Sequence, residues 1–501
     1  MKTIIRLLVV LALALALCPA ALAAEDGYST SYTYNYDYWG DIRESPDAYR
    51  VDQVLYSTSL GLETPMNKPQ SLFVSGDDLY ICDTGNNRIL QVRRENGEFS
   101  LTRIIDKVAG AQPETFNSPS DIGMDAEGNL YVADTNNNRV VKMDAQLNFM
   151  REYLKPDDTT FDQNLSFLPK RLVVDTSGRV FVLATNVNKG LVKFETDGSF
   201  TGFIGANPVT ITMWDYVWKS FFTTKAQRSQ QASFVPTEYE NIYIDSEGFI
   251  YATNVNFEEY DLLYDNAKPI RRLNSIGNDI LVKNDHYPPI GELYWVEEST
   301  DKGPSKFKDI TVFDNDIYVA FDRTRGRLFG YDPQGIMLWA FGTKDNSEGS
   351  FLSPISLEHM GTDLLALDEN GCSITVFTPT EYGSLIYKAS DEYLTGKYDE
   401  SADTWREVLK FNANYNLAYI GIGRSLMRQE NYEEAMEYFK MAFDRENYGR
   451  AYRYYRKQLV ERNIVPLVIV VAALLIVPLI IGRIKAMRQE VEAYERKKHR
   501  K

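Results

Sequence analysis

Short apolar runs separated by turn residues dominate the central part of the chain, and they follow one another in a regular order. The stretch LYVADTNNNRVV at 130–141 nearly repeats the stretch LYICDTGNNRIL at 79–90. Pro69, Pro119 and Pro169 stand at the start of three successive units and are 50 residues apart. A fixed period of this length indicates one structural unit that is repeated along the chain.

Each unit has the pattern of four short strands. The first strand follows the proline, and a turn such as Asp125–Gly128 leads to a second strand of the type LYVAD. The Asn-Asn pair makes the next turn, because Asn tolerates the left-handed backbone region. The third strand begins at Arg88 or Arg139, and a fourth, such as 149–154, closes the unit. Fainter units begin near Pro236, Phe307 and Pro354.

Six units of four strands predict a six-bladed β-propeller over residues 61–383, so the expected fold class is mainly β. Residues 24–60 precede it. Their Tyr-rich start, 28–39, fits either a surface strand or a disordered lead, and the pattern does not decide between them. We expect the stretch 49–60 to add a strand that closes the ring with the last blade.

The repeated phrase, with a preceding Pro-x-x-Ile/Leu-x-x-Asp, resembles the NHL repeat over roughly 60–380. The resemblance is clear in the first two units and weak in the last two. It implies that the phrase is architectural, and we expect Asp134 and Arg139 to pair across a turn or a blade seam. It also implies several functional types: extracellular sensor domains, RNA binders, and metal-dependent lyases or lactonases.

The pattern becomes helical after Tyr382. The stretch GKYDES at 396–401 is followed 34 residues later by ENYEEA at 430–435, with Gly423 and Ala435 at small-residue positions. This resembles the tetratricopeptide repeat, whose period is 34. The resemblance implies a packed helical stalk, 384–463, with modest capacity for interaction.

Both ends of the chain indicate a membrane protein. Residues 1–23 have the features of a secretory signal peptide, and Leu17 before Cys18 argues against lipidation. Residues 464–482 are an uncharged run of 19 residues, about 28 Å as a helix. A buried core helix is the alternative, but an all-round apolar run flanked by Arg favours a membrane span. We expect a single-pass cell-membrane protein, extracellular before 464, with a basic cytoplasmic tail, 483–501.

The charge is unevenly distributed. The formal net charge is −16; residues 448–501 contribute +9 and residues 1–23 contribute +2, which leaves −27 for residues 24–447. An exterior this acidic repels nucleic acid and anionic polymers, so we expect neither as a partner. The tail 483–501 carries eight Lys/Arg and is expected to lie against anionic membrane lipid.

Extra residues interrupt the period at 205–235, 254–268 and 284–306. In a propeller these connections emerge on one face, and long connections are usually functional. The stretch 211–222 predicts an amphipathic helix whose apolar stripe packs in a core or binds a ligand. As a ligand-binding face we expect the aromatic and His side chains Tyr216, Tyr260, Tyr264, His286, Tyr287, Tyr294 and Trp295.

Polar residues at the starts of the first strands should surround the channel mouth: Gln70, Asp121, Arg171, Glu238 and Asp309. They either hold a cation or polar ligand or form a hydrated rim. If a metal binds, Asp121, Glu238 and Asp309 are its expected ligands. No cofactor is expected, although Ca²⁺ is possible.

The two mature cysteines, Cys82 and Cys372, lie in units one and six, which become neighbours when the ring closes. A disulfide would lock the ring. Aligning the units puts the two residues on different strands, which favours reduced thiols.

The function favoured by these patterns is non-catalytic binding or scaffolding at the cell surface, with a carbohydrate, a peptide or a membrane protein as partner. RNA is excluded by location and charge, and only His286 and His359 are available for a zinc site. A Ca²⁺-dependent hydrolase or lactonase at the channel mouth is the alternative, since it requires only Asp, Glu and Asn. A third possibility is structural assembly through the stalk.

Overall fold

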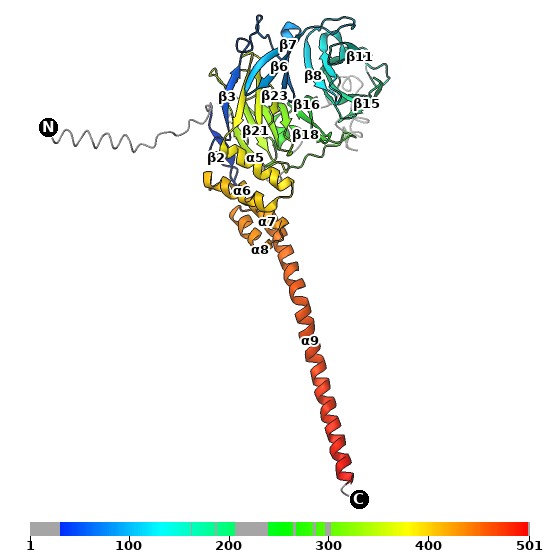
Figure 1. Ribbon diagram of the computed structural model, residues 1–501, viewed down its shortest axis with the longest axis vertical. Coiled ribbons are helices and arrows are strands. Elements are labelled where there is room, and N and C mark those ends of the chain that lie inside the picture. The colour runs from blue at the N-terminus through cyan, green and yellow to red at the C-terminus, as the bar shows by residue number, and fades with distance from the viewer. Residues whose placement is uncertain are drawn as a thin grey trace, which may run out of the picture. The chain divides into compact units, whose positions relative to one another are not determined.

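The computed structural model arranges the predicted repeats as six antiparallel sheets, the blades of a propeller (Figure 1). It describes residues 31–161, 163–185, 187, 189–205, 239–263, 267–283, 287–295 and 302–498. The predicted signal peptide lies outside these ranges. The chain divides into two compact units, residues 1–387 and residues 388–501.

The first three blades each consist of four strands that follow one another in the sequence. Blade one has β4 (Ser71–Ser75), β5 (Asp78–Asp83), β6 (Arg88–Glu95) and β7 (Glu98–Ile105). Blade two has β8 (Pro119–Met124), β9 (Leu130–Asp134), β10 (Arg139–Met143) and β11 (Phe149–Tyr153). Blade three has β12 (Leu168–Val174), β13 (Val180–Thr185), β14 (Leu191–Phe194) and β15 (Phe200–Ile204).

The last three blades depart from this plan. Blade four has β16 (Tyr239–Ile244), β17 (Ile250–Asn254) and β18 (Ile270–Leu273), with the short helix α4 (Glu259–Leu263) between the last two. Blade five has β19 (Phe307–Val312), β20 (Tyr318–Asp322), β21 (Arg327–Tyr331) and β22 (Met337–Phe341). Blade six has β23 (Pro354–Met360), β24 (Asp363–Asp368) and β25 (Ser373–Pro379).

Segments from the N-terminal part complete blades five and six. Strand β3 (Tyr49–Leu55) pairs antiparallel with β25 and closes the ring, which confirms the role predicted for this stretch. Most of the Tyr-rich start belongs to a hairpin of β1 (Thr33–Tyr36) and β2 (Ile42–Ser45). This hairpin extends blade five, because Tyr34 of β1 pairs with Ala340 of β22.

The hydrophobic core is divided among the seams between neighbouring blades. One cluster joins blades one and six through side chains such as Leu90 and Leu365. Another joins blades two and three, and similar clusters follow around the ring. Each fully buried aliphatic side chain contributes roughly 1.5–3 kcal/mol. The rigid frame of the channel therefore comes from packing between blades.

The repeated phrase, which comprises strand β9, the turn after it and the start of β10, is architectural. Asp134 accepts hydrogen bonds from the backbone N–H of Asn117 at 2.8 Å and from Arg139 Nε at 2.9 Å. The next turn is the 3₁₀ segment η2 (Thr135–Asn137), followed by Asn138 in the left-handed conformation at φ 58°. The first copy repeats these features, with η1 (Thr84–Asn86) as its turn. These bonds confirm the predicted Asp134–Arg139 pair.

Cys82 and Cys372 are free thiols. Cys82 is buried on β5, and burial raises the pKa of its thiol well above the usual value. The reduced state favoured from the sequence is the state in this structure.

The second unit is helical, as the changed period predicted. Its elements are α6 (Tyr398–Phe411), α7 (Asn416–Arg428), α8 (Tyr432–Met441) and α9 (Arg445–Lys498), preceded by α5 (Glu381–Leu394) across the unit boundary. Gly423 packs against Phe439, since an added Cβ would lie 2.6 Å from the ring. A small residue is therefore required where α7 meets α8. The tetratricopeptide character of this unit stays a prediction.

Helix α9 contains a segment long and apolar enough to cross a membrane. Pro466 and Pro478 lie inside the helix without ending it. The predicted orientation, with the tail in the cytoplasm, stays a prediction.

Candidate functional site

The innermost strand of every blade places a buried polar side chain at the same register position. In each blade, this residue stands opposite the same position of the second strand, for example Asp121 opposite Ala133 and Arg171 opposite Leu183. These six residues, the polar ring, are Ser71, Asp121, Arg171, Asn241, Asp309 and Ser356. Three of the predicted channel residues are thus brought to one level of the channel.

The two carboxylates of the polar ring bond neighbouring blades to each other. Asp121 of blade two accepts from Ser71 Oγ of blade one at 2.5 Å and from the backbone N–H of Leu172 of blade three at 2.7 Å. Asp309 of blade five accepts from Ser356 Oγ of blade six at 2.8 Å. A main task of these side chains is therefore structural.

Arg171 is the cation of the polar ring. Its guanidinium donates to the carbonyl oxygens of Ser120 at 2.8 Å and Gln70 at 3.0 Å, which precede the ring in blades two and one. Burial raises the pKa of Asp121, and it raises the pKa of Asp309 to about 6, although the positive charge of Arg171 opposes both shifts.

A second polar layer lies one residue before the ring, on the side of the inserted segments. Five inner strands have a bulge at this position; the bulged residue is polar in blades two to five and is the buried Ile355 in blade six. Lys170 and Lys308 both bind Oε1 of Glu240, the former at 3.0 Å. Burial alone would raise the pKa of Glu240, but the two ammonium groups lower it to about 2. Gln70 donates to Glu369 at 2.7 Å.

The mouth of the channel differs from the sequence prediction in blade four. Glu238 lies outside the described residues, and Asn241 occupies the ring position of that blade. In blade four Tyr239 occupies the position that Pro119 and Pro169 have in blades two and three, so counting two residues from Pro236 gave Glu238. Gln70 lies at the mouth, one residue before the ring.

The predicted metal ligands do not form a cluster in the part of the chain that the structure describes. There, the group of three carboxylates with oxygens within 4.8 Å of one another is Asp245, Glu247 and Asp316, outside the channel. Arg272 forms ion pairs with all three and offsets part of their charge. Whether the channel binds Ca²⁺ stays a prediction.

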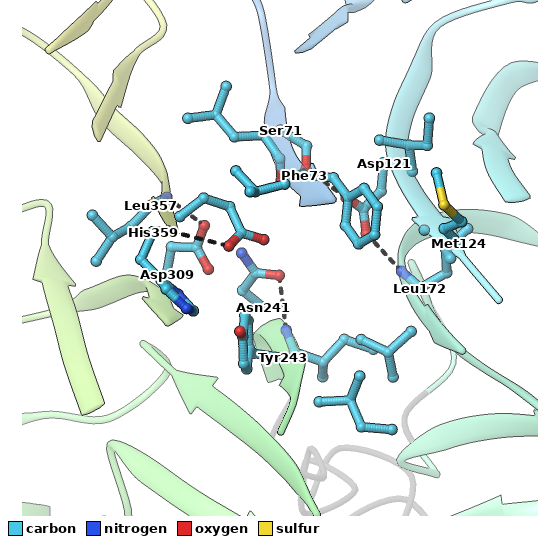
Figure 2. A pocket seen from close by; sticks show the side chains of 18 of the residues that line it. Ser71, Phe73, Asp121, Met124, Leu172, Asn241, Tyr243, Asp309, Leu357 and His359 are labelled. Carbon is cyan, nitrogen blue, oxygen red and sulfur yellow. Dashed lines mark hydrogen bonds between the residues drawn. The ribbon is translucent and has the colours of Figure 1, made fainter. Parts of the chain in front are cut away.

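A cavity of about 370 Å³ occupies the channel below the polar ring (Figure 2). It extends toward the turns after the inner strands, where Gly76 and Gly361 lie, and so away from the inserted segments. Asn241 and Tyr243 of blade four line it beside Asp309 of the neighbouring blade five, with His359 next to Asp309, and Phe73 and Leu172 lie on other sides (Figure 2).

Two residues of this cavity, Glu358 and His359, were not among the predicted site residues. Glu358 is buried, and burial raises the pKa of its carboxyl well above the usual range, with further increases from Asp309 and Asp121. The alternation of a strand could have found it, since Glu358 is two residues beyond Ser356.

His359 lies beside a hydroxyl group. Its Nδ1 is 2.7 Å from Oγ1 of Thr311. Its ring packs edge-on against Phe313, with 4.9 Å between the two ring centres. Burial lowers the pKa of His359 to about 4, so the imidazole is neutral at physiological pH.

Replacing Glu358 with Gln should stabilise the propeller, and more so as the pH rises. The folded-state pKa of Glu358 is above its ordinary value of 4.5, so the wild type loses stability as the pH rises from about 4.5 toward the folded pKa. Glu358→Gln removes that loss. Thermal unfolding should show little change near pH 4 and a raised Tm at alkaline pH. Glu127→Gln, on an exposed turn, is the control. An equal change in Tm at both pH values would contradict a raised pKa of Glu358 in the folded state.

Two of the inserted segments lie together, as predicted. Lys306 Nζ donates to the carbonyl oxygen of Val255 at 2.9 Å and lies 3.6 Å from the ring centre of Phe257. Tyr260 and Tyr294 are 63% and 54% exposed. Tyr287 and Trp295 are half-buried, and Tyr216, Tyr264 and His286 lie outside the described residues.

The tip of the N-terminal hairpin packs against the third inserted segment. Tyr287 donates from its hydroxyl to the carbonyl oxygen of Tyr38 at 3.0 Å. Gly40, at φ 82°, leaves no room for a Cβ, which would lie 2.7 Å from Tyr287 Oη. Trp39 contacts Tyr38 edge-on and is 61% exposed. We call Tyr38, Trp39, Tyr287 and Tyr294 the aromatic surface.

Hydrogen bonds within the hairpin hold Trp39 in place. Asp37 accepts from the backbone N–H groups of Trp39 at 2.9 Å and Asp41 at 3.0 Å, and from Arg43 Nε at 2.8 Å. These bonds lower the pKa of Asp37, although its slight burial acts in the opposite direction. The indole is therefore presented to solvent on a fixed turn.

Comparison with known proteins supports the reading of the repeats. Residues 116–143, which belong to blade two, match the NHL repeat. Blade two of the propeller thus contains an NHL repeat. NHL repeat-containing protein 3 of Mus musculus is 28% identical over 144 residues, 26% of this chain and 40% of that protein. The chain therefore matches less than half the length of this relative.

Solved structures with a similar arrangement share little sequence. Virginiamycin B lyase from Staphylococcus aureus is 13% identical, with a TM-score of 0.38, over 69% of this chain and 87% of that chain. A putative gluconolactonase is 9% identical, with a TM-score of 0.38, over 67% and 94%. The activities of these proteins are not carried over at this level of similarity.

Proposed function

We propose that the protein is a membrane-anchored, non-catalytic binding protein that captures a protein partner at its aromatic surface, outside the cell. The observation that carries this proposal is the fixed presentation of Trp39, 61% exposed on a turn held by Asp37. Holding a large aromatic ring in water on a rigid turn lowers the entropy cost of binding.

The composition of the surface favours a protein over a carbohydrate. Trp and Tyr lie beside Arg43, whose side chain is 55% exposed, and these three residue types are enriched among binding hot spots. The channel carboxylates Asp121 and Asp309 are occupied with bonds between blades, which supports binding rather than catalysis. The apolar segment of α9 supplies the membrane anchor.

Site-specific photocrosslinking tests the proposal. A benzophenone amino acid at position 39 should give one discrete adduct in the native membrane, and the same probe at Met150 should not. Met150 is a matched control on β11, because it is 49% exposed. The purified partner should then bind the full chain, and Trp39→Ala should weaken binding by about 2 kcal/mol or more, roughly thirtyfold. Equal adducts at both positions, no adduct, or an adduct with glycan alone would reject the proposal.

A second candidate function is hydrolysis in the channel cavity. Thr311 and the neutral imidazole of His359 are within hydrogen-bond distance, and Glu358 is an adjacent buried acid. This arrangement places a hydroxyl beside a base and an acid that line the cavity. Turnover of an ester or lactone panel that is lost in both Thr311→Val and His359→Asn would favour this function over the first.

A further inference from the structure

The cavity below the polar ring contains polar groups whose hydrogen-bonding capacity is only partly used within the fold. Asn241 is 4% exposed; its Oδ1 accepts from the backbone N–H of Ile242 at 2.8 Å, and its NH₂ group faces the cavity (Figure 2). Glu358 is 8% exposed; it accepts a long bond of 3.3 Å from the backbone N–H of His359 and a bond from the Thr311 hydroxyl, which leaves part of its acceptor capacity free. Buried polar groups are normally satisfied, so these two invite a ligand.

The charge of the cavity selects the sign of that ligand. Three carboxyl groups line it, those of Asp121, Asp309 and Glu358. Arg171 offsets part of this charge, but its guanidinium donates to carbonyl oxygens on the other side of the ring and is not part of the lining. A buried acidic cavity attracts cations and disfavours anions.

The spacing of the carboxyl groups selects the kind of cation. A divalent metal needs several oxygens at about 2.0–2.6 Å from one point. Among the described residues, no three carboxylate oxygens of this cavity lie within 4.8 Å of one another. An ammonium group with several N–H donors can reach dispersed acceptors, and the aromatic rings of Phe73 and Tyr243 supply a wall suited to a cation and its apolar substituent.

We propose that the channel cavity binds a small organic ammonium ion, with Glu358 as its hydrogen-bond acceptor, the negative charges of Asp309 and Asp121 adding to the attraction, and the Asn241 side chain orienting a polar substituent. The volume of about 370 Å³ limits the ligand to a small molecule. The site lies in the channel and does not depend on the aromatic surface, so either proposal can fail without the other.

Isothermal titration of the full chain in detergent, at mildly alkaline pH, tests this site. The probes are butylammonium and benzylammonium, with butan-1-ol and benzyl alcohol as neutral counterparts and CaCl₂ as the metal. We expect saturable binding of at least one ammonium probe at millimolar concentration, and binding at least about tenfold weaker for its alcohol.

The variants locate the site. Glu358→Gln keeps the size of the side chain but removes its capacity for charge, and it should weaken ammonium binding by about tenfold or more. Glu127→Gln removes an exposed carboxylate elsewhere and should leave binding unchanged. Thermal unfolding confirms that both variants are folded. The proposal is overturned if neither ammonium probe binds, if the alcohols bind equally well, if Ca²⁺ competes with the ammonium probe, or if the two variants behave alike.

Discussion

Replacing Arg139 with Met is expected to destabilise the propeller by about 3–5 kcal/mol, the cost of leaving a buried charge without its partner. The Arg139 and Asp134 side chains are 1% and 0% exposed. Arg139 also donates to the carbonyl oxygen of Pro113 at 2.6 Å, so the turn loses a second bond. Denaturant unfolding of the full chain in detergent measures the change in the free energy of unfolding.

An exposed ion pair of the same type provides the control. Arg93 and Asp78 form two hydrogen bonds, at 2.9 and 2.7 Å, but the Arg93 side chain is 46% exposed. Arg93→Met should therefore cost less than about 1 kcal/mol. If both variants lose the same free energy of unfolding, burial does not determine how much the Asp134–Arg139 pair stabilises the fold. The repeated phrase would then have a role other than stability.

Most of the propeller could be predicted from the 50-residue period of the sequence. A proline every 50 residues and the LYVAD phrase determine where blades one to three begin, because each blade must bury the same faces against its neighbours. The Asn-Asn turn is similarly local, since it requires a left-handed residue at Asn87 and Asn138. The helical unit also follows from a local period.

Other features depend on contacts that the sequence does not display. The hairpin β1–β2 pairs with β22, about 300 residues away, and no local pattern indicates this partner. The inner strand of blade four has Tyr239 where blades two and three have Pro119 and Pro169, so Asn241 was missed as a ring residue. Glu358 follows from simple alternation, but its strand was among the weakest repeats, and its importance arises from burial between blades.

Replacing Glu292 with Leu is expected to release the N-terminal hairpin from blade five. Glu292 is 3% exposed and accepts from the hydroxyl groups of Tyr34 at 2.8 Å and Tyr36 at 3.3 Å, and it forms an ion pair with Arg327. The variant leaves the Arg327 charge and the buried Tyr34 hydroxyl without this partner. A local loss of about 3 kcal/mol should speed hydrogen exchange of β1 by roughly a hundredfold.

The same substitution tests whether the hairpin positions the aromatic surface. Once the hairpin is released, Trp39 is no longer held beside Tyr287, so partner capture at position 39 should be lost although every aromatic side chain remains. The double variant Glu292→Leu with Arg327→Met removes both charges and should recover part of the protection, because no buried charge is left unpaired. Unchanged exchange of residues 33–45 in Glu292→Leu would show that strand pairing alone holds the hairpin. If the partner is still captured while the hairpin is released, the tip of the hairpin is not part of the binding site.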